Sequence, residues 1–97
     1  MKIIILDRAV GHIRDGSWFY ERQGRGLGSY FRTSILDDIK RLKTTAGVHR
    51  VVLGRYHRSI SRRFPFAIYY RIESGQVRVH AVLDSRRHPD WIRRQLK

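Results

Sequence analysis

Residues 66–84 read FAIYYRIESGQVRVHAVLD and give the strongest indication of the fold. Two runs with strand character, Phe66–Glu73 and Gln76–Asp84, flank Ser74-Gly75, a two-residue turn signal that is typical of a β-hairpin. If Glu73 faces Gln76, one side of the hairpin is apolar throughout and needs a covering layer. The pairs expected on that side are Ile72 with Val77, Tyr70 with Val79, Ile68 with Ala81 and Phe66 with Leu83.

The opposite side of the hairpin is more basic and is expected to face solvent. Its predicted pairs are Arg71 with Arg78, Tyr69 with His80 and Ala67 with Val82. Two arginines that face each other on neighbouring strands repel. We therefore expect a negative group beside them, either Glu73 on the same strand and face or a bound phosphate.

The residues before the hairpin predict a covering layer of helices. Lys2–Leu6 has the continuous, β-branched character of a short buried strand. Asp7 is a suitable N-cap for a helix that runs to about Arg22. After a short glycine-containing turn, a second helix is expected over Leu27–Ala46, because its apolar residues recur every three or four positions and Gly47 follows at the C-cap. Helices joined by so short a link form an antiparallel hairpin.

Shorter elements complete the predicted fold. Val51–Leu53 and Arg58–Phe64 are candidate strands, Pro65 marks an interruption, and Pro89–Leu96 is predicted to be a short helix with Pro at its first position. We therefore predict an α+β fold in a single domain, residues 1–97. An N-terminal strand and a helical hairpin pack on a curved, mostly antiparallel sheet, and a short C-terminal helix follows.

The charge balance limits the classes of function. The 97 residues include 21 Lys and Arg against 8 Asp and Glu, a formal net charge of +13 at pH 7. A compact domain with this excess predicts a polyanionic partner, either nucleic acid or a strongly acidic protein. The lack of Cys excludes a disulfide framework and a Cys nucleophile. No apolar run is long enough for a signal peptide or a membrane span, so we expect a cytoplasmic protein without a membrane partner.

The remaining residue patterns predict no metal and no cofactor. Five His without Cys and without an H-x-x-x-H pair do not fit a zinc site. Asp37 and Asp38 lie in the middle of a predicted helix and are expected to face solvent. His12 is expected to lie at the surface, and Asp84 to pair with Arg86 or to cap the turn.

Basic and aromatic side chains gather on the predicted open face of the sheet. The planar fork of Arg binds phosphate through two parallel hydrogen bonds, and Tyr and His stack on unpaired bases. The same composition suits metal-free RNA cleavage, in which one group deprotonates the ribose 2′-hydroxyl, cations stabilise the transition state and an acid protonates the leaving oxygen. For any one arginine, a solvated surface without a function is the alternative.

Residues 62–73 (RRFPFAIYYRIE) and 79–89 (VHAVLDSRRHP) resemble the RelE/ParE toxin superfamily of bacterial type II toxin–antitoxin modules. The end of the first predicted helix, Trp18–Gln23, and Gly26-Leu27-Gly28 at the start of the second agree with this resemblance. It implies the fold described above and a growth-inhibiting toxin that is held silent by an acidic antitoxin. Such a partner is expected to wrap the cationic surface and to contact exposed apolar side chains on the helices.

The superfamily divides in activity, and the residues leave the division open. RelE-like members cut messenger RNA on the ribosome, whereas ParE-like members inhibit DNA gyrase without acting as nucleases. Our working hypothesis is a ribosome-dependent, metal-independent mRNA endonuclease, with gyrase inhibition and plain nucleic-acid binding as alternatives. The candidate catalytic residues are His80, His88, Arg62 and Arg86. The residues expected to bind phosphate or target are Arg58, Arg63, Tyr69, Arg71, Arg78 and Arg87.

Overall fold

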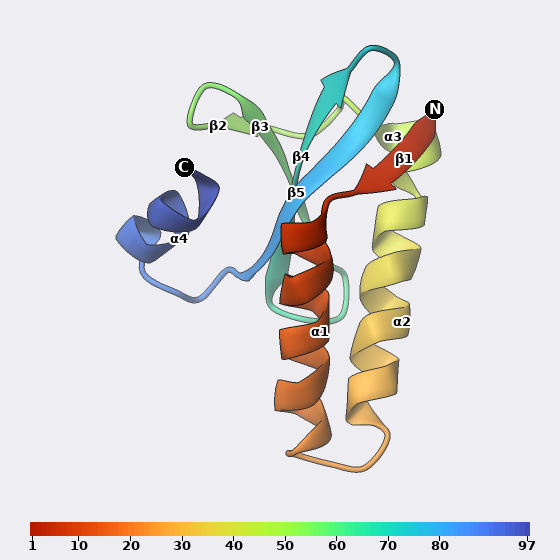
Figure 1. Cartoon of the computed structure of the whole chain (residues 1–97), viewed down its shortest axis with the longest axis vertical. Helices are drawn as coiled ribbons and strands as arrows, with labels where there is room; N and C mark the ends of the chain where they lie inside the picture. Colours follow the sequence, from red (N-terminus) through yellow and green to blue (C-terminus); the bar gives the residue numbers. More distant parts are fainter.

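The computed structural model describes residues 1–97 and contains four helices and five strands. The helices are α1 (Asp7–Glu21), α2 (Leu27–Lys40), α3 (Leu42–Thr45) and α4 (Pro89–Leu96). The strands are β1 (Lys2–Ile5), β2 (Val51–Val52), β3 (Tyr56–Ile60), β4 (Phe66–Glu73) and β5 (Gln76–Asp84). Figure 1 shows α1 and α2 running side by side, while α4 lies apart from them on the other side of the sheet.

The sheet has five strands in the order β1-β5-β4-β3-β2. β1 runs parallel to β5, and the other pairs are antiparallel. The predicted bounds of β4, β5 and α4 are confirmed. Ser74 and Gly75 between β4 and β5 both have positive φ, as a tight hairpin turn of the primed type requires. The predicted α+β architecture is therefore confirmed.

A β-bulge in β5 changes the register that the sequence predicted. Pairing follows the prediction from Glu73–Gln76 to Tyr70–Val79, and then one residue of β5, His80, is left without a partner. A bulge inserts such an extra residue and bends the strand. Beyond it the observed pairs are Tyr69 with Ala81, Ile68 with Val82, Ala67 with Leu83 and Phe66 with Asp84. The predicted pairs Tyr69–His80, Ile68–Ala81, Ala67–Val82 and Phe66–Leu83 are wrong for this reason.

The two sides of the sheet carry separate apolar cores. The larger one, of 12 buried residues, lies between the sheet and the α1–α2 hairpin and includes Phe31, Ile35 and Tyr70. The second, of 6 buried residues, lies beneath α4 and includes Tyr56, Tyr69 and Leu96. The expectation that this second side is open is therefore wrong over its centre, where α4 covers it and leaves Tyr69 only 2% exposed.

Element boundaries differ from the predictions where turns and caps decide them. α1 begins at Asp7, and its N-cap is Leu6, whose side chain makes no hydrogen bond, rather than the predicted Asp7. Asp7 lies in the first turn, where its negative charge interacts favourably with the helix dipole. The second predicted helix is divided at Arg41 into α2 and α3. β2 ends before Leu53, which has positive φ. β3 covers Tyr56–Ile60 rather than Arg58–Phe64, because the chain turns tightly after it and the Ser61 N–H donates to the Phe66 carbonyl.

Candidate functional site

Several of the predicted target-binding residues meet in a cleft between α4 and the sheet. We call this concavity of about 230 Å³ the α4 cleft. Its lining includes Arg58 of β3, Tyr69 of β4 and Arg87 of the segment before α4. Arg58 is paired with Tyr69 across the β3–β4 ladder, so the register places a guanidinium beside a phenol. The other polar residues that line the cleft are Ser85 and Arg93.

The α4 cleft is electropositive and contains a protonated phenol. Burial raises the pKa of Tyr69, and the neighbouring Arg58 opposes this only in part, so the phenol is a hydrogen-bond donor at neutral pH. The guanidinium carbon of Arg87 lies 3.9 Å from the centre of the Trp91 ring, a cation–π contact that fixes its position. Neither Arg58 nor Arg87 is in an ion pair. The arrangement therefore suits a carboxylate or a phosphate ligand.

Arg62, a candidate catalytic residue, is bound to the helical hairpin instead. Its Nε donates to Asp38 Oδ1 over 2.9 Å, and Ser61 Oγ donates to Asp38 Oδ2 over 2.9 Å. Asp38 is 7% exposed, so the expectation that it faces solvent is wrong. The loop after β3 covers this carboxylate and supplies its partners. Arg63, next in the loop, is exposed and makes no ion pair, and it does not line the α4 cleft.

Arg86 forms the ion pair that the sequence predicted. Its Nη2 lies 2.8 Å from Asp84 Oδ2, and both its Nε and its backbone N–H donate to Asp84 Oδ1. The hydrogen bond from the Arg86 side chain holds the pKa of Asp84 below its usual value. The charge of Arg86 is thus largely compensated within the turn.

At the turn end of the β4–β5 hairpin, Arg71, Arg78 and His80 surround one carboxylate. We call these residues, with Glu73, the hairpin-tip cluster. The Arg71 Nε, the Arg78 Nε and the His80 Nε2 each lie 3.9 Å from Glu73 Oε1. Arg71 and Arg78 are directly paired, and Glu73 supplies the expected negative group. The structure thus brings three of the four patch residues together, whereas Tyr69 lies beneath α4.

The two candidate histidines are placed differently: His80 is mostly buried, whereas His88 is exposed and uses one ring nitrogen as a helix cap. His80 is mostly buried, its Nε2 makes no hydrogen bond, and burial and then the charge of Arg71 lower its pKa. It is therefore neutral at pH 7. His88 is exposed and is the N-cap of α4, where its Nδ1 accepts from the Asp90 N–H over 3.0 Å. His88 therefore has a structural role at the start of α4 through one of its two ring nitrogens.

Sequence reasoning missed three residues that hold these regions in place. Asp38 orients the loop that carries Arg62, and Trp91 holds Arg87. His12 is half-buried rather than a surface residue: its Nδ1 accepts from the Val82 N–H just after the bulge, and burial lowers its pKa. Spacing gives no signal for Asp38 or His12, because their partners lie far away in the chain. The four-residue separation of Arg87 and Trp91 was the only local indication.

No group of three or more His, Cys, Asp or Glu side chains is arranged to hold a metal ion. None of the helices combines the length and the apolar character needed to cross a membrane.

Comparison with known proteins supports the fold. No protein-family model and no curated protein matches the sequence. Among solved structures, a chain from the chromosomal ParDE toxin–antitoxin system of P. aeruginosa is similar, with a TM-score of 0.73. The match covers 84% of this chain and 92% of that one, with 16% sequence identity. The fold implied by the RelE/ParE resemblance is therefore confirmed.

Proposed function

We propose that this chain is the toxin of a type II toxin–antitoxin module and that it arrests growth by binding a target rather than by cutting RNA. The similarity in fold to a chain of a ParDE system supports the toxin assignment. The charge of +13 supports an acidic antitoxin as its inhibitor. The proposed location is the cytoplasm, where the targets of such toxins lie. No cofactor is required by this activity.

The choice between binding and cutting depends on where the four candidate catalytic residues lie and what they contact. A general base must reach the proton that it removes, but His80 is enclosed in the hairpin-tip cluster. Arg62 and Arg86 are ion-paired to Asp38 and Asp84. His88 uses one ring nitrogen to cap α4. These placements favour the ParE-like alternative, inhibition of DNA gyrase, over the RelE-like nuclease of our working hypothesis.

The α4 cleft is the proposed contact site for the target. Arg58 and Arg87 are in no ion pair within the chain, whereas Arg93 is paired with Asp90, and Tyr69 adds a hydrogen-bond donor. Carboxylates on an acidic protein surface would complete these groups through charge-assisted hydrogen bonds. Arg63, Arg71 and Arg78 would widen the positive surface that steers the encounter.

Two assays test the proposal. The chain is induced in bacteria while transcript ends are mapped by sequencing, and the purified chain is added to a DNA supercoiling reaction of gyrase. We expect growth arrest, intact transcripts and loss of supercoiling. Codon-phased cuts in messenger RNA together with normal supercoiling would contradict gyrase inhibition and support the nuclease activity. Normal growth of cells that produce this chain and lack the antitoxin would contradict the toxin assignment itself.

A further inference from the structure

The turn between β4 and β5 forms one end of the molecule. Figure 1 shows it at the far end of the long axis from the turn that joins α1 and α2. The hairpin-tip cluster lies beside this turn, on the side of the sheet away from the helical hairpin, because Tyr70, Val77 and Val79, which alternate with its members along the strands, are buried in the larger core. The side chains of Arg71 and Arg78 are each 36% exposed, so a large partner can reach them.

Three nitrogen atoms of the cluster face one point and have no hydrogen-bond acceptor there. The Nε atoms of Arg71 and Arg78 and the Nε2 of His80 each lie 3.9 Å from Glu73 Oε1, which is longer than a hydrogen bond. The His80 Nε2 is buried and has no other partner. Glu73 therefore balances charge in the cluster without making a hydrogen bond to any of the three nitrogen atoms.

The positive charge around this point exceeds what one carboxylate can balance. Arg8, in the first turn of α1, donates from its Nε to the His80 carbonyl over 3.4 Å, so three guanidinium groups surround Glu73. Burial lowers the pKa of His80, the charges of the three arginines lower it further, and Glu73 opposes them. The ring is therefore neutral at pH 7, and in the tautomer with its proton on Nε2 it can donate a hydrogen bond to an anion.

The spacing of the three nitrogen atoms fits a phosphate group. In a charge-assisted hydrogen bond, the donor nitrogen lies about 2.8 Å from a phosphate oxygen and therefore roughly 4 Å from the phosphorus atom behind it. Nitrogen atoms that converge on one point at 3.9 Å are at this distance from a phosphorus atom placed there. In the free chain the Glu73 carboxylate occupies this point, and its side chain, 42% exposed, is free to rotate toward solvent.

Among partners that carry phosphate, duplex DNA matches the shape of this part of the molecule. A two-stranded β-ribbon enters the major groove of B-form DNA, whereas the major groove of double-stranded RNA is too narrow to admit side chains. The cluster also continues the α4 side of the sheet, because the rings of His80 and Tyr56 are in contact with their centres 5.3 Å apart, and Tyr56 belongs to the core beneath α4. DNA gyrase, the proposed target, acts on duplex DNA.

We propose that the hairpin-tip cluster binds a backbone phosphate of duplex DNA and that the Glu73 carboxylate gives way to it. Arg71 and Arg78 donate charge-assisted hydrogen bonds to the phosphate, and His80 completes the site. The inference rests on the proposed inhibition of gyrase and adds a second contact to it, with the α4 cleft on the protein and the hairpin tip on the DNA. Without DNA, Glu73 occupies the site and offsets the repulsion between the two arginines.

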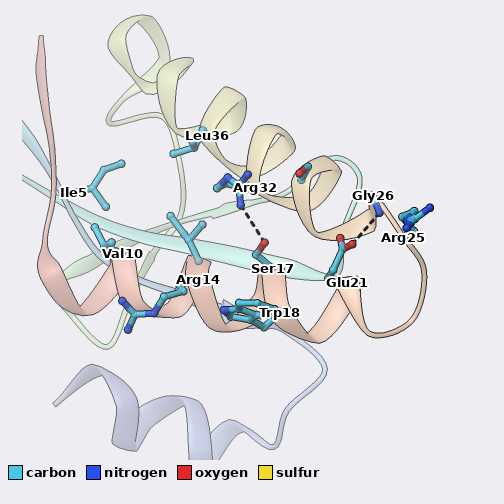
Figure 2. A pocket seen from close by; sticks show the side chains of 12 residues that line it. Ile5, Val10, Arg14, Ser17, Trp18, Glu21, Arg25, Gly26, Arg32 and Leu36 are labelled. Carbon is cyan, nitrogen blue, oxygen red and sulfur yellow. Dashed lines mark hydrogen bonds between the residues drawn. The ribbon is translucent and has the colours of Figure 1, made fainter.

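The test measures binding of the full chain to a short, fluorescently labelled DNA duplex of mixed sequence, by anisotropy, without gyrase and over a range of salt concentrations. Arg71→Gln and Arg78→Gln each remove one donor of the site. Arg14→Gln is their matched control, because Arg14 is an exposed residue of α1 beside the concavity between the two helices (Figure 2) and is in no ion pair.

A second pair of variants tests the role of the carboxylate. Glu73→Gln removes the group that competes with phosphate, and Asp37→Asn, at an exposed position on α2, is its control for the same change in net charge. Thermal unfolding of each variant without DNA checks that the fold is kept. The supercoiling reaction of gyrase is run with the same set of proteins.

We expect Arg71→Gln and Arg78→Gln each to weaken DNA binding about tenfold and to reduce the slope of log affinity against log salt by about one. Arg14→Gln should change the affinity by less than about twofold, because salt screens a charge that makes no contact. Glu73→Gln should bind DNA several times more tightly than the unaltered chain, and Asp37→Asn should bind as the unaltered chain does.

Equal losses of affinity in Arg71→Gln, Arg78→Gln and Arg14→Gln would overturn the site, and so would a Glu73→Gln variant that binds DNA no better than Asp37→Asn. Tighter binding of an RNA duplex than of the DNA duplex would overturn the assignment to DNA. The supercoiling reaction keeps the two proposals apart. Inhibition of gyrase without a selective loss of DNA binding in the two arginine variants would overturn the DNA site alone, whereas a selective loss without inhibition would support the DNA site and contradict the proposed target.

Discussion

Two arginines outside the α4 cleft differ from two inside it in whether the chain supplies a carboxylate partner. Arg62, in the loop from β3 to β4, lies 2.9 Å from Asp38, and Arg86, just after β5, lies 2.8 Å from Asp84. In the cleft, Arg58 and Arg87 have no carboxylate partner, and an aromatic ring lies beside each of them. Neighbours in sequence, such as Arg86 and Arg87, thus have different roles.

This contrast shows that a net charge does not identify the residues that bind a target. A guanidinium that is paired within the chain must break that pair before it binds a ligand, whereas an unpaired one binds without this cost. The hairpin-tip cluster is intermediate, because one carboxylate, that of Glu73, serves two arginines. Four substitution experiments test this difference between paired and unpaired arginines.

Removing the buried partner of Arg62 should have the largest effect on stability. Asp38→Ala leaves the Ser61 hydroxyl and the Arg62 guanidinium unpaired, so we expect the free energy of unfolding to fall by about 2–3 kcal/mol. Urea unfolding measures this. The control is Asp37→Ala, an exposed neighbour on the same helix, which should change stability by less than about 0.5 kcal/mol. Equal effects of the two changes would mean that Arg62 is not held in this way.

Substitution in the α4 cleft should affect activity and leave the fold intact. We expect Arg58→Gln and Arg87→Gln each to weaken inhibition of the target about tenfold, because each removes an interfacial arginine. The concentration needed for half-inhibition in the supercoiling assay measures the effect. Arg94→Gln, an exposed position on α4 outside the cleft, is the control. If Arg62→Gln weakened inhibition more than Arg58→Gln did, the distinction between paired and unpaired arginines would fail.

The shared carboxylate of the hairpin-tip cluster should contribute modestly. Glu73→Gln leaves Arg71 and Arg78 facing each other without a negative group, and we expect a loss of about 0.5 kcal/mol, since all three side chains are partly exposed. Combining Glu73→Gln with Arg71→Gln should restore stability. Unfolding measured at low and high salt would show the loss shrinking as salt screens the repulsion. A loss that persists in the double variant would have another origin.

The Arg86–Asp84 pair should give the smallest effect on stability, and the size of this effect depends on pH. The pKa of Asp84 is lowered in the folded chain, so the pair stabilises above the pKa of the unfolded state, and this stabilisation is lost as pH falls through the folded pKa. We expect Arg86→Gln to be less stable than the unaltered chain at neutral pH. The two unfolding curves should converge in acid, below both pKa values. A difference that grows toward low pH would contradict the ion pair.

The sequence was sufficient for the parts of the fold that local patterns determine. The Ser74-Gly75 turn fixes the hairpin because both residues adopt positive φ, and Pro89 begins α4 as its fixed φ allows. The apolar repeat of α2 predicts the face that packs on the sheet, with Phe31, Ile35 and Ile39 buried. These signals come from residues that are close together in the chain.

The remaining features depend on contacts between distant residues. No pattern in the sequence predicts the bulge at His80. Beyond it, the observed pairing differs from the predicted pairing by one residue. Asp38 could not be recognised as buried, because Ser61 and Arg62 cover it from 23 and 24 residues away. For the site, the sequence identified Arg58 and Arg87 as members of a basic group. It could not separate them from Arg62 and Arg86, since that difference is made by the tertiary position of two aspartates.

The parallel pairing of β1 with β5 affects the order in which parts of the fold can form during synthesis. Residues 2–5 pair with residues 76–79, so β1, which is synthesised first, cannot pair until β5 has been made. The α1–α2 hairpin, whose contacts are local, can form earlier. The α4 cleft needs residues up to Leu96, so the surface proposed to contact the target is expected to be among the last parts of the fold to form.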